Sequence, residues 1–272
     1  MSEYSVSTET GIEHVVVGPD PGDRIVKPWP EALLFLHGLG GDWTNWLPQL
    51  DHFGRRHRCI SWTMPGYGES EPIDPMNWSG LAAAAVRLLD RYAIGRATIV
   101  GLSMGGMVAQ QFAVDHPDRV ERMVLAGTSL SFGRPGSDFA EKYLAMRYGP
   151  LDAGQTPADL APSIADGLLG SSPAEGARAN AIASMSRITD PAYRRALECL
   201  VTWDFADQAK RIEVKAMCVA GDEDQTAPFS SAERLAKAIP WAELAKVEAC
   251  GHLINLEQPE AFNQLVEYTI AR

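Results

Sequence analysis

Short apolar runs alternate with helical patterns along most of this chain, and this alternation limits the fold more than any other feature. Gly, Pro and Asp bound the runs, which are ALLFLHG, RCISW, ATIVG, ERMVLAG, KAMCVAG and AELAKVE. Strands that are separated by helices need crossover connections, so they lie parallel and helices cover both faces of the sheet. The sequence therefore predicts an α/β domain built on a mostly parallel sheet.

The alternation breaks between about residues 131 and 207, where helical patterns follow one another without a strand-like run. Examples are SDFAEKYLAMRY, ADLAPSIADGLL, ARANAIASMSRI and PAYRRALECLVTW, with GRPGS and GSSPAEG as punctuation. Because strand-like runs precede and follow this region, the simplest interpretation is a helical cap inserted into the sheet domain. We predict an α/β core of residues 1–132 and 208–272 and a cap of residues 133–207.

Charge and composition disfavour several classes of function. Lys and Arg number 24 against 35 Asp and Glu, a formal net charge of −11 that repels phosphate backbones and anionic membranes. No stretch offers the roughly 20 apolar residues of a membrane span, and the first residues lack a secretion-signal pattern. We therefore expect a cytoplasmic protein with neither nucleic acid nor a membrane as partner, and the sequence carries no signal for an oligomeric state.

The cysteines are far apart in the sequence and form no CxxC pair. They lie mostly within apolar stretches, where buried and reduced thiols are common, so neither a disulfide framework nor a metal site is expected. They are Cys59, Cys199, Cys218 and Cys250.

The stretch GLSMGG, which begins at Gly101, lies where a strand turns sharply into a helix. It fits the pattern G-x-S-x-G, with ATIV before it and the helical MVAQQFAV after it. A side chain at Gly101 or Gly105 would collide with the neighbouring strand or helix, and the turn forces an unfavourable backbone on Ser103. The hydroxyl is then exposed, while the Met104 N–H at the helix start points toward a developing negative charge. We predict Ser103 as a nucleophile and Met104 as an oxyanion donor.

A serine nucleophile needs a general base and a carboxylate that orients the base. Downstream of the serine, His252 lies in a sheet-to-helix loop, CGHLINLEQPEAF, whereas His116 precedes a proline at the end of the helix. The segment GDEDQTAP follows a strand, and its glycine-to-proline spacing favours Asp224 over Asp222 as the acid. The order Ser, acid, His is the one that this type of elbow requires. Three histidines upstream of the serine have surface or helix-end patterns: His14, His52 and His57.

The loop HGLGGDWTNW follows an earlier strand and is predicted to complete the oxyanion hole. Its glycines let the backbone approach a ligand, and the Leu39 N–H is the predicted second donor. Asp42 is interpreted as the N-cap of a helix that begins near Trp43, and His37 as a side chain that supports the loop. Candidate pocket residues are His37, Trp43, Trp46, Met146, Met185, Arg187, Trp203 and Leu253. Packing into the core is the alternative for the tryptophans and methionines, and a solvated helix face is the alternative for Arg187.

Several of these motifs, in their order and approximate spacing, resemble those of the α/β-hydrolase superfamily: HGLGG, MPGYGES, GLSMGGMVAQQFAVDHPDRVERMVLAG, GDEDQTAP and GHLINLEQPEAF. The resemblance covers nearly the whole chain and implies a twisted eight-stranded sheet, the triad and oxyanion donors given above, and a helical cap, without a cofactor. The elbow and its helix are similar to those of 3-oxoadipate enol-lactonases and related small-ester hydrolases. One departure is Thr63, where relatives usually carry Asp.

The predicted activity is hydrolysis of a small-molecule carboxylic ester or an enol-lactone or other lactone through an acyl-enzyme on Ser103. C–C bond hydrolysis of the meta-cleavage type is an alternative, although those relatives usually place Trp after the catalytic histidine, where this chain has Leu253 and Ile254. A ligand receptor on the same fold is the alternative outside the enzymes, because fold does not dictate function. Arg187 is the candidate to pair with a substrate carboxylate.

Overall fold

Eight strands form one sheet in the described part of the chain, a computed structural model that describes residues 4–19, 31–133 and 135–272. Their order across the sheet is β1-β2-β4-β3-β5-β6-β7-β8, and β3 to β8 run parallel while β1 and β2 pair antiparallel. The strands are β1 (Val6–Ser7), β2 (His14–Val17), β3 (Ala32–Leu36), β4 (Cys59–Trp62), β5 (Ala97–Leu102), β6 (Val120–Ala126), β7 (Ala216–Gly221) and β8 (Ala242–Val247).

Each of the six apolar runs forms a strand, so the predicted parallel sheet is confirmed. The central strands are mostly apolar because helices cover both of their faces, and β3, β4, β5 and β7 are buried at every residue. The surface pattern inferred for His14 is wrong. This residue is fully buried in β2, where its ring bonds the Ile12 carbonyl and the Tyr92 hydroxyl, at 2.6 and 2.7 Å.

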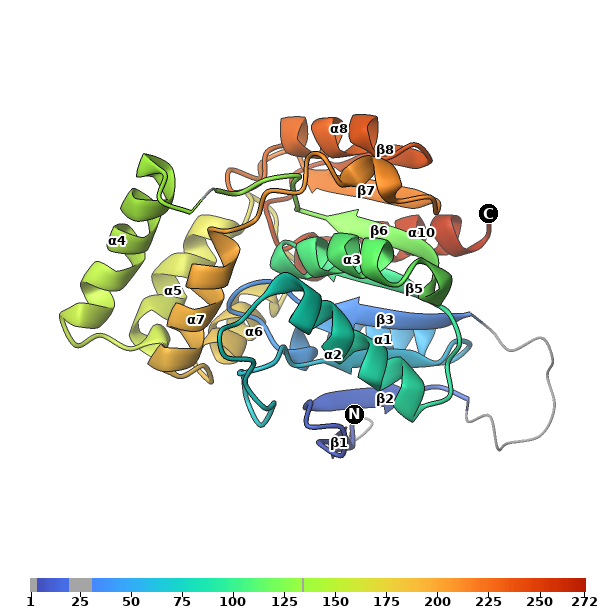
Figure 1. Ribbon diagram of the computed structural model, residues 1–272, viewed down its shortest axis with the longest axis horizontal. Coiled ribbons are helices and arrows are strands. Elements are labelled where there is room, and N and C mark those ends of the chain that lie inside the picture. The colour runs from blue at the N-terminus through green and yellow to red at the C-terminus, as the bar shows by residue number, and fades with distance from the viewer. Residues whose placement is uncertain (1–3, 20–30, 134) are drawn as a thin grey trace.

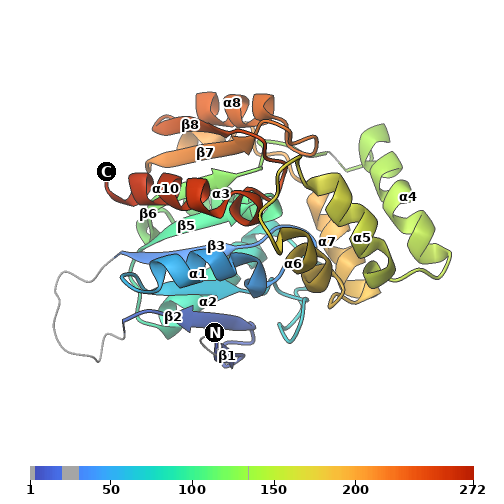
Figure 2. The same ribbon diagram turned by 180° about the vertical axis from the view of Figure 1, so that it is seen from behind.

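Helices pack on both faces of the sheet, as Figures 1 and 2 show from opposite sides. On one face lie α2 (Trp78–Arg91), α3 (Met104–Asp115) and α8 (Phe229–Ala238), and on the other α1 (Leu47–Phe53), α9 (Ile254–Glu257) and α10 (Pro259–Ile270). Each face buries its own apolar cluster against the sheet. The described residues also include short 3-10 helices: η1 (Trp43–Trp46), η2 (Pro117–Arg119) and η3 (Ala209–Arg211).

A helical insertion joins β6 to β7 and lies beyond the carboxyl ends of the strands (Figure 1). It contains α4 (Asp138–Asp152), α5 (Pro157–Leu168), α6 (Ala177–Met185) and α7 (Asp190–Leu200). The division at residues 132 and 208 stays a prediction, and the predicted ranges include residues 1–3, 20–30 and 134, which lie outside the described part.

The chain enters and leaves this insertion through one paired stem. Ser131 and Asp204 form an antiparallel bridge, the Phe132 N–H donates to the Trp203 carbonyl at 2.9 Å, and the Phe205 N–H donates to the Leu130 carbonyl at 2.8 Å. We call residues 130–132 with 203–205 the insertion stem. The two ends of the insertion therefore meet at one place on the core.

The buried cysteines carry protonated thiols at neutral pH. Burial raises the pKa of Cys199 and Cys218 to about 12 and also raises the pKa of Cys59 and Cys250. Within the described residues, no cluster of three or more His, Cys, Asp or Glu side chains is arranged to hold a metal ion. None of the helices in that part of the chain is both long and apolar enough to cross a membrane.

Candidate active site

Ser103 lies between β5 and α3 in a strained turn. Its φ of 54° falls in the left-handed region, where a non-glycine residue costs about 1–3 kcal/mol. A Cβ at Gly105 would lie 2.0 Å from the Leu36 carbonyl oxygen, and one at Gly101 would lie 2.4 Å from the Gly105 oxygen. Both glycines are therefore needed for β3, β5 and α3 to meet closely, and their packing holds the serine at the end of its strand.

His252 and Asp224 form a buried pair on the loops after β8 and β7. The imidazole Nδ1 lies 2.8 Å from the Asp224 carboxylate, and the Thr226 and Ala227 N–H groups donate to the other carboxylate oxygen at 2.8 and 2.9 Å. Burial works to raise the pKa of Asp224, but the His252 charge and these hydrogen bonds outweigh it and leave the pKa below its usual value. The ionised carboxylate accepts a hydrogen bond from the Nδ1–H, and this contact leaves Nε2 as the ring nitrogen that can take a proton from the serine.

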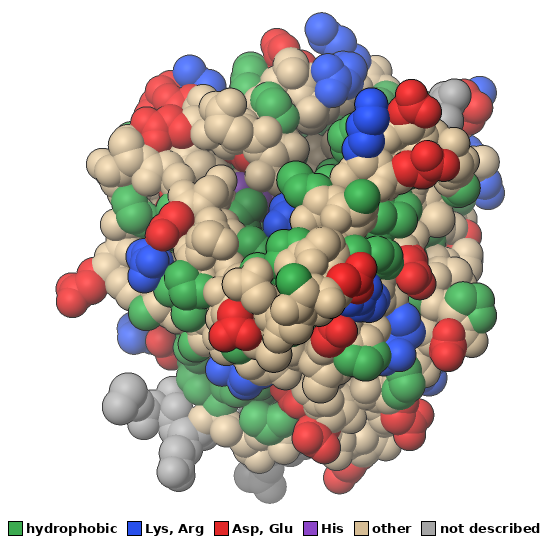
Figure 3. Space-filling view, turned by 90° about the vertical axis from the view of Figure 1, so that its left-hand side faces the viewer, with side chains coloured by type: hydrophobic (Ala, Val, Ile, Leu, Met, Phe, Trp, Pro, Cys, Tyr) green, Lys and Arg blue, Asp and Glu red, His purple; other side chains and the backbone are tan. Residues whose placement is uncertain are grey.

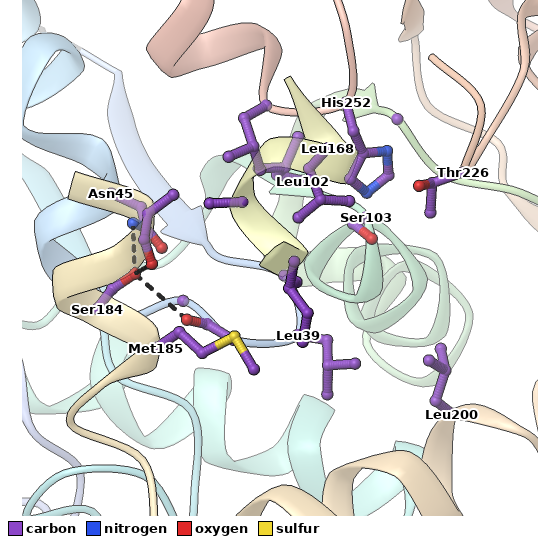
Figure 4. A pocket seen from close by; sticks show the side chains of 18 of the residues that line it. Leu39, Asn45, Leu102, Ser103, Leu168, Ser184, Met185, Leu200, Thr226 and His252 are labelled. Atoms are coloured by element: carbon purple, nitrogen blue, oxygen red, sulfur yellow. Dashed lines mark hydrogen bonds between the residues drawn. The ribbon is translucent and has the colours of Figure 1, made fainter. Parts of the chain in front are cut away.

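The three side chains meet because parallel strands end at one edge of the sheet. Ser103 follows β5, Asp224 follows β7 and His252 follows β8, so residues far apart in the sequence share the carboxyl edge. Figure 4 shows the His252 ring beside Ser103, with Leu39 nearby. Ser103, His252 and Leu39 all line the same cavity.

Two backbone N–H groups border the serine. Leu39 lies in the loop after β3, and Met104 begins α3, whose first N–H groups have no partner within the helix. Among the described residues, neither N–H donates to a protein acceptor. A Cβ at Gly38 would lie 2.9 Å from the Ser103 Cβ, so only glycine lets the Leu39 loop approach the serine this closely.

His37 holds the loop of Leu39 in place through hydrogen bonds and does not line the cavity. Its Nε2 accepts the Met64 N–H at 2.8 Å, so Nδ1 carries the proton and donates to the Gly38 carbonyl at 2.7 Å. Burial lowers the pKa of His37 and keeps the ring neutral. Its assignment as a pocket residue is therefore wrong, whereas the supporting contact to the loop is present.

The cavity lies between the sheet edge and the helical insertion and has about 930 Å³ of empty space, part of it open to solvent. Figure 3 shows the hollow in this face, with histidine and a cationic side chain visible inside. Apolar side chains from α5, α6 and α7 form much of its wall, among them Ile164, Leu168, Met185 and Leu200. A concave and mostly apolar wall with a few polar groups is typical of sites that bind small organic molecules.

The pocket candidates divide sharply. Leu253 and Met185 line the cavity, whereas Trp43, Trp46, Met146, Arg187 and Trp203 do not. Trp46 is fully buried against Phe35 and Phe262, on the face of the sheet that α1, α9 and α10 cover. Trp43 packs beside Tyr4. Asp42 caps the turn that holds both tryptophans, as predicted.

The remaining misplaced candidates have other partners. Trp203 is buried in the insertion stem, where its Nε1–H donates to the Ser129 carbonyl at 2.9 Å and its ring stacks on Phe205. Met146 is 58% exposed on the outer surface of α4. Arg187 bonds the Asp42 carboxylate through Nε at 2.7 Å, so its charge is already neutralised.

Arg147 is the cation that the sequence interpretation missed. It lines the cavity from α4, one position beyond Met146. Its Nε is buried without a protein partner among the described residues, and its guanidinium lies over the Tyr143 ring at 5.3 Å. Burial raises the pKa of the neighbouring Tyr193 to about 12, although the Arg147 charge opposes this rise. An unneutralised cation in an apolar wall is a ready partner for an anionic group.

Comparison with known proteins identifies a family for this arrangement. Residues 31–259 match the family model described as alpha/beta hydrolase fold. The chain is 28% identical over 242 residues to 3-oxoadipate enol-lactonase 2 of Acinetobacter baylyi, with 89% of each chain covered. It is also 28% identical over 253 residues to 2-hydroxy-6-oxo-6-phenylhexa-2,4-dienoate hydrolase of Burkholderia cepacia, with 86% of each covered.

Solved structures show the same fold. The enol-lactonase from Burkholderia xenovorans LB400 superposes with a TM-score of 0.81 at 23% identity, over 98% of this chain and 100% of the other. The match includes an eight-stranded mostly parallel sheet with a helical insertion, so the fold expected from the motifs is confirmed.

Proposed function

Because the chain belongs to the α/β hydrolase family, we propose that it hydrolyses small carboxylic esters or lactones through an acyl-enzyme on Ser103. One observation carries the proposal. A strained serine, a histidine paired with an ionised carboxylate, and the Leu39 loop line one cavity, and the Met104 N–H, which like the Leu39 N–H has no protein acceptor among the described residues, directly follows the serine. Acyl transfer uses a nucleophile, a base and oxyanion donors in this combination.

The first half-reaction forms the ester on the enzyme. His252 Nε2 takes the Ser103 proton as Ser103 Oγ bonds to the substrate carbonyl carbon, and the carbonyl oxygen becomes an oxyanion. The Leu39 and Met104 N–H groups stabilise that oxyanion, and Asp224 stabilises the imidazolium. The carbon–oxygen bond to the leaving group then breaks, and the His252 proton goes to the leaving alkoxide.

Water completes the cycle. His252 Nε2 takes a proton from water as the water oxygen bonds to the acyl carbon, and a second oxyanion forms in the same N–H pair. Collapse of this intermediate breaks the Ser103 ester, and His252 returns the proton to Ser103 Oγ. A lactone substrate releases one hydroxy acid, or the tautomeric keto acid where the lactone is an enol-lactone.

The cavity wall supports a substrate with an apolar body and one anionic group. The inserted helices supply aliphatic side chains, and Arg147 supplies a charge that no carboxylate of the described residues neutralises. The net charge of −11 repels anions at long range, so a local cation is needed to hold one. We therefore favour esters or lactones whose acyl part ends in a carboxylate.

Carbon–carbon hydrolysis is the second candidate. The Burkholderia cepacia relative named above hydrolyses a dienoate, and its identity to this chain equals that of the enol-lactonase. Leu253, directly after the catalytic histidine, lines the cavity and gives it an aliphatic wall at that point. Product analysis separates the two reactions because only C–C cleavage divides a carbon chain.

The test is product analysis by mass spectrometry with acid release followed in a pH-stat. The panel contains aryl and alkyl esters, lactones, enol-lactones, thioesters and a dienoic C–C substrate, and Ser103→Ala is the blank. Cleavage of one ester or lactone class that disappears in Ser103→Ala is the expected result. Turnover that survives in Ser103→Ala refutes the acyl-enzyme, and absence of turnover in a folded protein would favour a ligand receptor.

A further inference from the structure

Glu257 is a fully buried carboxylate that the reaction described above does not use. It ends the short helix α9 and is only 1% exposed. Its Oε2 accepts the Gly170 N–H at 2.7 Å and the Gly251 N–H at 3.0 Å, and its Oε1 accepts the Leu253 N–H at 2.9 Å. Hydrogen bonds to a charged acceptor are the strong ones, so this group holds three backbone positions together.

Two of those positions flank the candidate base. Gly251 and Leu253 are the neighbours of His252 on either side, and the His252 N–H itself donates to the Leu168 carbonyl at 2.7 Å. All three consecutive N–H groups are therefore bound, two by Glu257 and one by the end of α5. The backbone that carries the imidazole has little freedom to rotate or shift.

The segment that follows α5 is part of the same arrangement. We call residues 168–172 the connector, because they leave α5 and lead toward α6. A Cβ at Gly170 would lie 2.6 Å from the Gly251 nitrogen, so the two backbones are in direct contact. On the other side, the Glu223 carboxylate accepts the Ser171 hydroxyl at 2.7 Å and also its N–H.

The connector thereby touches both catalytic loops. Glu223 is adjacent to Asp224 in the sequence, and Glu257 holds the loop of His252. Leu168 also lines the cavity. One segment of the insertion is thus a wall of the substrate cavity and a brace for the acid and the base.

We propose that Glu257 is a positioning residue that, together with the connector, keeps His252 aligned between Asp224 and Ser103. The inference rests on the proposed function, since it assigns His252 as the base. A displacement of about 1 Å in a reacting group costs about a hundredfold in rate. An amide in place of the carboxylate turns one oxygen into an N–H donor that faces backbone donors, so at least one of the three bonds is lost.

The experiment compares three variants with the wild type. Glu257→Gln removes the acceptor, and Gly170→Ala forces the connector away from Gly251 while Glu257 is retained. Glu31→Gln is the matched control, because it makes the same chemical change at a half-buried carboxylate that bonds Thr98 and Arg122 before β3, at the opposite edge of the sheet.

Three quantities are measured: kcat and KM on the ester or lactone substrate, the affinity of that substrate in a Ser103→Ala background, and the proton NMR signal of the His252 Nδ1–H. We expect Glu257→Gln and Gly170→Ala to lower kcat about a hundredfold and to shift or broaden the Nδ1–H signal. In Glu257→Gln, substrate affinity in the Ser103→Ala background should stay at its parent value. Glu31→Gln should keep kcat and the signal.

Other results overturn the proposal. Wild-type kcat and an unchanged Nδ1–H signal in Glu257→Gln refute it, and so does a loss of kcat that matches the loss of folded protein seen by circular dichroism. If Glu257→Gln does not fold, Gly170→Ala decides by the same criteria. Failure of the proposed function is distinct, because then wild-type turnover survives Ser103→Ala while the NMR comparison still reports the alignment of His252.

Discussion

Arg147 gives the sharpest test of which substrates enter the cavity. Replacement by Met keeps most of the side-chain volume and removes the charge that lines the wall from α4. A hydrogen bond to a charged group contributes about 1.5–3 kcal/mol. Arg147 as a whole is only partly buried, so solvent screening favours the lower half of that range. At 1.36 kcal/mol for each factor of ten, kcat/KM for a carboxylate-bearing ester should fall about 10- to 50-fold.

The assay pairs two substrates that differ only in charge. One is the monoaryl ester of a short dicarboxylic acid, and the other carries a carboxamide in place of the free carboxylate. Arg147→Met should lower kcat/KM for the charged ester and leave the amide ester nearly unchanged, while Arg147→Lys should retain part of the preference. Arg187→Met is the matched control, because Arg187 is already paired with Asp42 and should not discriminate between the substrates.

An equal loss on both substrates would refute the reasoning, since it would mean that Arg147 supports the fold of α4 and does not bind an anion. A preference for the charged ester that survives in Arg147→Met but disappears in Arg187→Met would return the role to the residue expected from the sequence.

Three further predictions concern stability and reactivity. Ser103→Gly should relieve the strain of the positive φ and raise the free energy of unfolding by about 1 kcal/mol in a urea titration while abolishing turnover, and a less stable variant would contradict the strain. The pKa of Asp224 is lower in the folded protein than in the unfolded chain, so its contribution to stability is complete above the unfolded pKa and is lost as the pH falls toward the folded pKa. Asp224→Asn should therefore reduce the dependence of the melting temperature on pH in this acidic range, measured by thermal melts at several pH values. An equally steep dependence in the variant would argue against this contribution. The native protein should not react with a thiol reagent at pH 8, and denaturant should expose the thiols of Cys59, Cys199, Cys218 and Cys250; fast labelling without denaturant would show that burial does not protect them.

The sheet and the three catalytic candidates could be predicted because local sequence specifies them. Six apolar runs became strands, and the glycines around Ser103 mark a turn that other residues cannot make. Chain order then placed Asp224 and His252 at the same sheet edge. The strands β1 and β2 escaped notice because they are short and join the sheet through antiparallel pairing, which leaves no long apolar run.

The pocket wall was harder to predict because it depends on how each inserted helix is rotated. Met146 and Arg147 are neighbours on α4, yet about 100° of helical rotation separates them, so one faces solvent and the other the cavity. Tyr143 and Arg147 share a face at i, i+4 spacing, which was the available signal. Glu257 gave no signal at all, since its three partners are backbone groups, one of them in the insertion.

The insertion stem has a consequence for how such a protein can change over evolutionary time. Its two segments are hydrogen-bonded to each other, so the chain enters and leaves the insertion at two points that lie side by side. An insertion of different length or helix number can therefore replace this one without changing the distance between its two ends at the stem. Substrate selectivity can then evolve independently of the catalytic residues, provided that each new segment also holds the loops of Asp224 and His252 in place.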